Sequence, residues 1–201
     1  GIIHASNAAP WNSPGVLRQY LGWLGRRNAP LILRPTALPR MTRWGLEFLW
    51  HSRRGSFERA LRANARLGVY SLEQLRLLRE RTGIRYDEAQ RGALAVHDDP
   101  GALDAAAAAA RTIADEGIRH ERLDREATLA HEPALAAAEA SLAGSLFYPD
   151  DESGDAHLYT QRLAELARDR GAELHLGTTV HGFLGGNGRV TGVRTDRGAY
   201  Q

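Results

Sequence analysis

The sequence predicts an α/β fold, and its last third carries the clearest signal. Residues 145–148 form an apolar strand, and residues 155–170 follow with leucines at helical spacing and Gly171 beyond the last turn. Residues 174–176 then alternate apolar and polar side chains, which is typical of a strand. A strand, a helix and a strand within about thirty residues are typical of the crossover unit of a parallel sheet.

The composition is that of a globular chain and excludes several kinds of site. Of the 201 residues, 43% are hydrophobic and none is cysteine. Disulfides, thiolate nucleophiles and cysteine-based metal sites are therefore excluded. We expect no membrane-spanning helix, because no run of about eighteen apolar residues occurs. The sequence contains no series of alternating basic and aromatic residues of the kind that binds nucleic acid, so a nucleic-acid partner is not expected.

The first half of the chain favours helices. Residues 1–15 are rich in Asn, Pro and Gly and are expected to form an extended loop. Leucine and tryptophan at helical spacing predict short helices within 16–27 and 41–54. Ser56 is expected to cap a long helix that ends near Gly83 and carries an apolar stripe.

Shorter elements follow in the middle. Asp99 and Pro100 form a typical helix start, a cap residue followed by proline in the first turn, for a helix that extends to Gly117. The alanine run at 105–110 lies within this helix. Further short elements are expected as strands at 91–97 and 118–123 and a helix at 124–131.

A glycine-rich segment near the end of the chain is predicted to be a hairpin turn. Residues 186–191 approach the dinucleotide pattern G-x-G-x-x-G, but Thr191 replaces the last glycine and a strand-like segment follows. The motif requires a helix start to bind pyrophosphate, so a turn between two strands is favoured. Another strand begins at 199–201. Since the sequence stops there and starts at Gly1 rather than methionine, we expect it to be a piece of a longer protein.

An acidic cluster occupies residues 150–157, with four carboxylates and one histidine. A helix-capping loop is the favoured interpretation, because acidic groups stabilise a helix N-terminus. The neighbourhood of an active site and a metal site are the alternatives. The eight histidines are scattered and predict no metal site, and no serine nucleophile motif occurs. No catalytic residue can be assigned.

The charge of the chain is unevenly distributed. Residues 1–91 hold 16 of the 26 arginines and only 6 acidic residues, and all four tryptophans lie in the first fifty residues. Short helices that combine Trp, Leu and Arg can bind an anionic membrane surface. The alternative is ordinary packing of the tryptophans with solvated arginines.

The order of several segments resembles one family, the small catalytic subunit of bacterial FAD-dependent D-amino-acid dehydrogenases. The resemblance is sharpest at the two ends, in GIIHASNAAPWNSPG at 1–15 and PDDESGD at 149–155. It continues through three shorter segments, 82–86, 92–94 and 132–135. These enzymes belong to the wider family of FAD-dependent glycine, sarcosine and D-amino-acid oxidases.

The resemblance implies an activity, a cofactor and partners. The parent protein would bind FAD and oxidise a D-amino acid by hydride transfer from Cα to the flavin, giving a 2-oxo acid and ammonia. Electrons would pass to a quinone-type respiratory acceptor, and the enzyme would be cytoplasmic with peripheral contact to the inner membrane. The alternatives are a related flavin amine oxidase for glycine, sarcosine or a cyclic imino acid, and a non-catalytic α/β interaction module.

The resemblance also implies a division of the chain and a set of site residues. Residues 1–85 and 143–201 would belong to an incomplete FAD-binding domain, and residues 86–142 to a substrate domain built on a mixed sheet. Gly1, Ile2 and Val180 would contact the cofactor, and His4, Asn7 and Trp11 are candidates for the substrate cavity. We expect the 201 residues alone to bind FAD poorly and to be inactive.

Overall fold

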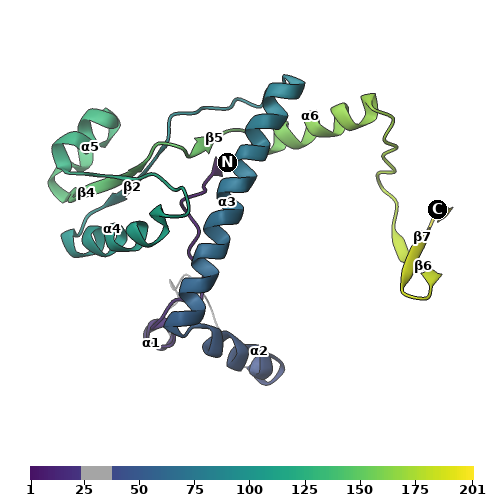
Figure 1. Ribbon diagram of the computed structural model, residues 1–201, viewed down its shortest axis with the longest axis horizontal. Coiled ribbons are helices and arrows are strands. Elements are labelled where there is room, and N and C mark those ends of the chain that lie inside the picture. The colour runs from purple at the N-terminus through teal and green to yellow at the C-terminus, as the bar shows by residue number, and fades with distance from the viewer. Residues whose placement is uncertain (24–37) are drawn as a thin grey trace. The chain divides into compact units, whose positions relative to one another are not determined.

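The computed structural model describes residues 1–23 and 38–201 (Figure 1). They divide into two compact units, Gly1–Tyr159 and Thr160–Gln201. The fold is mixed α/β, as predicted. Within the described ranges, however, every pair of neighbouring strands is antiparallel, so the predicted parallel crossover unit is not formed.

The first unit begins with three helices, α1 (Val16–Trp23), α2 (Leu38–His51) and α3 (Arg54–Thr82). The last residues of the first predicted helix, 24–27, lie outside the described residues. Gly83 ends α3 in the left-handed conformation, with φ of 66°, as predicted. The prediction that Ser56 caps α3 is wrong. The amides of Ser56 and Phe57 both donate to the Arg53 carbonyl, so Ser56 already lies in the first turn.

One stripe of α3 forms the main core. Leu61, Ala65 and Leu72 are buried at helical spacing and pack with Ala5 and Ala8 from the N-terminal segment. Close approach is possible because Gly68 lacks a side chain. A Cβ there would lie 3.1 Å from the Cα of Ala5. The expected extended loop at 1–15 is therefore fixed against α3.

A three-stranded sheet forms the second layer, with β4 (Gly144–Tyr148) between β2 (Ala93–His97) and β3 (Glu121–Leu123). Helix α4 (Pro100–Ala114) lies beside this sheet (Figure 1), and its Leu103, Ala107 and Ala110 pack on Leu146. The Asp99 carboxylate accepts the Ala102 amide as the predicted cap. Helix α5 (Arg125–His131) follows β3 as predicted, whereas the 3-10 helix η2 (Pro133–Ser141) was not foreseen.

Two very short strands connect the chain's distant segments. Strand β1 (Ile2–Ile3) pairs with β5 (Glu152–Ser153), which places Ile3 opposite Glu152. Both segments were predicted as loops. A two-residue strand carries no periodicity, so it cannot be recognised from a sequence alone.

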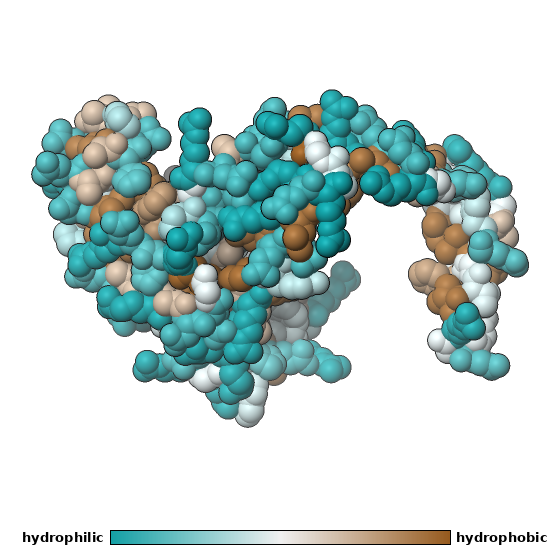
Figure 2. All heavy atoms as spheres, turned by 45° about the horizontal axis from the view of Figure 1, so that its top comes forward, coloured by the Kyte–Doolittle hydropathy of each residue, from teal (hydrophilic) through white to brown (hydrophobic). Residues whose placement is uncertain are grey.

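The second unit contains the larger part of helix α6 (Ala156–Asp169) and an antiparallel sheet of β6 (Val180–Gly186), β7 (Arg189–Thr195) and β8 (Gly198–Tyr200). The glycine-rich segment is the predicted hairpin turn. Asn187 and Gly188 both have positive φ, which is the geometry of a tight hairpin. The predicted strand at 174–176 is wrong: these residues have no strand partner, and Leu174 and Leu176 are exposed. Hydrophobic side chains gather on the surface of this unit (Figure 2), among them Phe183 and Val190.

Candidate functional site

The carboxylate of Asp151 organises the loop at residues 4–6. Its Oδ1 accepts the backbone amides of Ala5 at 3.1 Å and Ser6 at 3.4 Å. Its Oδ2 accepts the Ser6 hydroxyl and lies 3.0 Å from Nδ1 of His4. The side chain is only 2% exposed, and a buried carboxylate is tolerated when donors satisfy its oxygens. Asp151 therefore fixes both the loop backbone and the His4 ring.

The neighbouring carboxylate, Glu152, is held by two arginines of α3. Nε of Arg76 lies 2.6 Å from one carboxylate oxygen, and a terminal nitrogen of Arg79 lies 2.7 Å from the other. Arg79 also donates to the hydroxyl of buried Tyr86. Because Glu152 is 1% exposed, this ion pair connects β5 to α3 inside the protein.

Burial and charge act on Glu152 in opposite directions. Burial by itself raises the pKa of its carboxyl, but hydrogen bonds from Arg79 and Arg76 outweigh burial and hold the pKa below its usual value. The same hydrogen bond raises the pKa of the Arg79 guanidinium. A lowered folded-state pKa means that Glu152 stabilises the fold above its unfolded pKa of about 4.3 and that this contribution is lost as the pH falls through the folded value.

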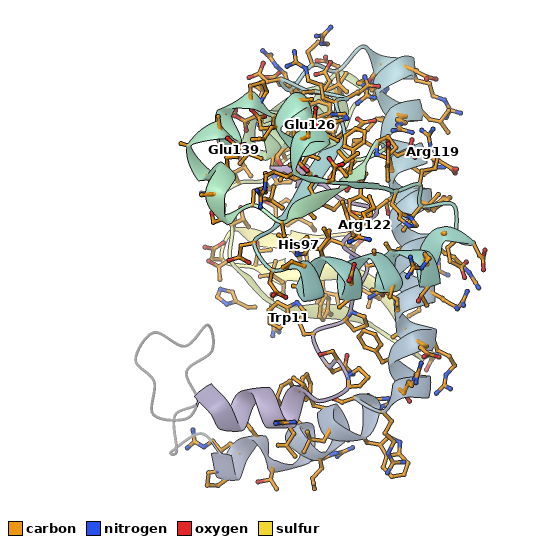
Figure 3. All side chains as sticks on the ribbon, turned by 90° about the vertical axis from the view of Figure 1, so that its left-hand side faces the viewer. Trp11, His97, Arg119, Arg122, Glu126 and Glu139 are labelled. Atoms are coloured by element: carbon orange, nitrogen blue, oxygen red, sulfur yellow. The ribbon has the colours of Figure 1, made fainter. Side chains whose placement is uncertain are left out.

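The other acidic residues of the cluster have structural partners. Asp155 accepts the amides of His157 and Leu158 at 2.8 and 3.0 Å, so the helix-capping interpretation is confirmed for this residue. Asp150 binds the guanidinium of Arg119, which lies beside α3 in Figure 3. Among the residues that the structure describes, no group of three or more histidine or acidic side chains could hold a metal ion.

A cavity of about 260 Å³ lies next to the loop that Asp151 organises. It is lined by His4, Ser6 and Asn7 on one side and by residues 93–95 and Tyr148 of the sheet on the other. The structure thus brings together two candidates for the substrate cavity, His4 and Asn7. Trp11 does not line this cavity, is 84% exposed and lies on the segment that leads to α1 (Figure 3).

A second cavity, of about 170 Å³, contains the predicted cofactor residues Gly1 and Ile2. Its other walls include Leu75, Tyr86 and Tyr159. The two tyrosine rings meet edge to face with centroids 5.0 Å apart. This cavity is therefore mainly apolar and aromatic. The cavity at His4, called the polar cavity below, differs because the side chains of His4, Ser6, Asn7 and Tyr148 bring polar groups to its wall.

The third predicted cofactor residue, Val180, lies in the second unit. It is the first residue of β6, pairs with Thr195 and is half exposed.

Solved structures that align with this chain include a glycine oxidase and an L-proline dehydrogenase. Glycine oxidase from Geobacillus kaustophilus aligns with 68% of the chain and 37% of its own length, at a TM-score of 0.58 and 25% identity. L-proline dehydrogenase from P. horikoshii aligns with 69% of the chain and 36% of its own length, at a TM-score of 0.56 and 23% identity. The chain belongs to the DAO family of FAD-dependent oxidoreductases, whose pattern matches residues 2–201.

Curated sequences confirm the resemblance to D-amino acid dehydrogenases. The enzyme of that name from Phenylobacterium zucineum is 40% identical over 98% of the chain. The one from Granulibacter bethesdensis is 35% identical over the same share. The alignments cover 46% and 47% of these two relatives, so the chain spans about half the length of the curated relatives it matches.

The buried ion-pair residues around the acidic cluster were not predicted from the sequence. Asp151 and Glu152 appeared only as members of an acidic cluster, and Arg76 and Arg79 were not singled out. One signal was available: the cluster holds more carboxylates than a helix cap needs, and the two arginines are three residues apart, on one face of a helix. That spacing does not identify which carboxylate they bind.

We predict that Glu152→Gln lowers the free energy of unfolding of the parent protein by about 3 kcal/mol at pH 7, because it leaves two arginines without their buried partner. Urea unfolding measures this difference. The difference should shrink as the pH falls from about 4.3, where the carboxyl of the unfolded chain becomes protonated, to the lower folded-state pKa, where the native carboxylate loses its charge.

Glu165→Gln is the matched control. The ion pair between Glu165 and Arg162 is about half exposed on both sides, so its loss should cost less than about 1 kcal/mol. Equal effects of the two substitutions would contradict the assigned role of Glu152.

Proposed function

We propose that the parent protein is an FAD-dependent dehydrogenase that oxidises the Cα–N bond of D-amino acids to give a 2-oxo acid and ammonia. The observation that carries this proposal is the 35–40% identity to D-amino acid dehydrogenases over 98% of the chain. A cavity with polar side chains from His4, Ser6 and Asn7 supports it, because a small zwitterionic substrate needs such partners.

The chemistry of the two cavities fits the flavin end of FAD. A flavin ring needs apolar and aromatic surroundings for its faces, and donors and acceptors for its polar edge. Gly1 and Ile2 line an apolar, aromatic cavity, and polar side chains follow at His4 to Asn7. When bound, FAD would supply the acceptor for the hydride. The residues of this chain would orient the substrate and exclude water from it.

We propose that residues 1–85 and 143–201 contribute to the FAD-binding domain and residues 86–142 to the substrate domain. With this division the two domains share one sheet. Strand β4 (144–148), from the FAD-binding part, pairs with β2 and β3, which belong to the substrate part. The polar cavity lies where β2 approaches the N-terminal loop, which is consistent with a substrate held between the two domains.

A related amine oxidase is the second candidate. The similarity to a glycine oxidase at 25% identity supports glycine as the substrate, and sarcosine or a cyclic imino acid is the further alternative that the family resemblance leaves open. The higher identity to D-amino acid dehydrogenases favours a D-amino acid. The family match along residues 2–201 favours either enzyme over a non-catalytic interaction module.

The full-length parent should be yellow and should lose its visible flavin absorbance when D-amino acids are added without oxygen. The L-enantiomers, glycine and sarcosine are the matched probes. Bleaching by glycine or sarcosine but not by D-amino acids would favour the second candidate. A folded, colourless parent that cannot be loaded with FAD would contradict both.

We propose that Val180 contacts FAD through its backbone. Val180→Ile should then bind FAD normally, whereas Val180→Pro should weaken binding at least about tenfold, because proline removes the N–H donor and fixes φ. Proline is tolerated at the first residue of a strand, so β6 should still form, as circular dichroism can verify. Equal FAD affinity of the Pro variant and the wild type, measured by titration of the apoprotein, would refute the contact.

We propose that electrons pass to a quinone-type acceptor and that the arginine-rich region 16–54 binds the inner membrane surface from the cytoplasmic side. On α2, the side chains of Trp44 and Trp50 are 56% and 59% exposed, and the Arg53 guanidinium lies 3.5 Å from the centroid of Trp50. The side chains of Trp44 and Trp50 are therefore accessible on α2 rather than packed in a core. Within the described ranges, no helix has the length and hydrophobicity to cross a bilayer.

The surface contact can be tested by sedimentation of the parent protein with vesicles. Four arginines are exchanged for Gln: Arg53 and Arg54, and Arg26 and Arg27, which lie outside the described residues. Each arginine near an anionic surface contributes up to about 1 kcal/mol, so binding should need anionic lipid, weaken with salt and fall strongly in the variant. Unchanged binding of the variant would exclude this region as the anchor.

A further inference from the structure

His4 and Asp151 form a hydrogen-bonded pair at the wall of the polar cavity. The carboxylate of Asp151 can only accept hydrogen bonds, so Nδ1 of His4, 3.0 Å away, carries the hydrogen. In the neutral ring the lone pair is then on Nε2. His4 is 31% exposed and lines the cavity, whereas Asp151 is buried behind it.

Asp151 cannot turn away from His4 without losing its other partners. The amides of Ala5 and Ser6 and the Ser6 hydroxyl hold the same carboxylate. The tautomer and the direction of the imidazole are therefore fixed before any ligand binds, as is usual where a carboxylate orients a functional histidine.

The other ionisable group that lines this cavity is Tyr148. Burial raises the pKa of its phenol, and the nearby charge of Asp151 raises it further. Tyr148 is therefore protonated near neutral pH and can donate a hydrogen bond, but it does not accept a proton there. Among the residues that line the cavity, His4 has the free basic nitrogen.

We propose that Nε2 of His4 accepts the proton of the substrate's ammonium group, with Asp151 as the positioning residue. This inference rests on the proposed oxidation of amino acids. An α-ammonium group is largely protonated near pH 7 and has no lone pair to form the C=N bond. In the transfer, one N–H bond breaks and its electron pair stays on the substrate nitrogen. An Nε2–H bond forms from the ring's lone pair, and the products are a neutral amine and an imidazolium beside Asp151.

The tautomer can be measured without turnover. In the full-length protein with ¹⁵N-labelled histidine, NMR should show His4 protonated on Nδ1. In Asp151→Asn the amide oxygen can still accept from the loop while its NH₂ donates to Nδ1, so the hydrogen should move to Nε2. A wild-type His4 with its hydrogen on Nε2 overturns the proposal.

The proton transfer is tested by rapid mixing of the FAD-loaded protein with a D-amino acid that the wild type oxidises. His4→Gln should slow flavin reduction about a hundredfold, the usual contribution of a general base, and change the substrate Kd less than about threefold. Asp151→Asn should slow it at least about tenfold, because the wrong tautomer presents no lone pair. His175→Gln is the matched control, since His175 pairs with Glu173 on the exposed surface of the second unit.

A His4→Gln rate within about threefold of the wild type overturns the role of His4 as proton acceptor. A loss in substrate affinity with an unchanged rate of reduction does the same, since it assigns His4 to binding alone. If the wild type binds FAD but oxidises no D-amino acid, the proposed function fails and the proton transfer with it. The NMR result separates that outcome from a wrong geometry of the pair.

Discussion

Two adjacent carboxylates, Asp151 and Glu152, hold the described site together. Side chains of successive residues in an extended chain point in opposite directions. Asp151 and Glu152 are both buried, and each carboxylate is bound by its own set of hydrogen-bond donors. Asp151 binds the loop at residues 4–6, and Glu152 binds Arg76 and Arg79 of α3. A carboxylate buried without donors would be strongly unfavourable, so each acid requires its partners to be in place.

This arrangement explains how a segment without regular structure can form the wall of a cavity. Residues 4–8 have few backbone partners of their own, and an ordered loop needs other sources of stabilisation. Ala5 and Ala8 provide burial against α3, Gly68 permits the close approach, and Asp151 satisfies the amides. The short pairing of β1 with β5 then sets the register between the N-terminal segment and the acidic cluster.

Local signals in the sequence predicted most of the helices and the hairpin. Asp99, Asp124 and Gly83 act at helix ends through contacts with nearby residues, and Asn187-Gly188 forms its turn in the same local way. The prediction of a strand at 174–176 was wrong, because alternating apolar and polar residues do not by themselves supply a partner strand. Much of the site is formed by long-range contacts: Asp151 binds residues about 146 positions away, and no periodicity encodes that distance. His4 and Asn7, two candidates that the family resemblance implied for the substrate cavity, line one cavity of the structure, and Trp11 does not. The role of this cavity in substrate binding stays a prediction.

Asp151 fixes the loop at residues 4–6 before any ligand binds. Amide hydrogen exchange of Ala5 and Ser6 in the full-length protein tests it most directly, because both amides donate to the same buried carboxylate. We expect slow exchange of both amides in the wild type and acceleration of at least about tenfold in Asp151→Ala, with the core amides of α3 unchanged. Fast exchange of these two amides in the wild type, or equal protection in the variant, would contradict it.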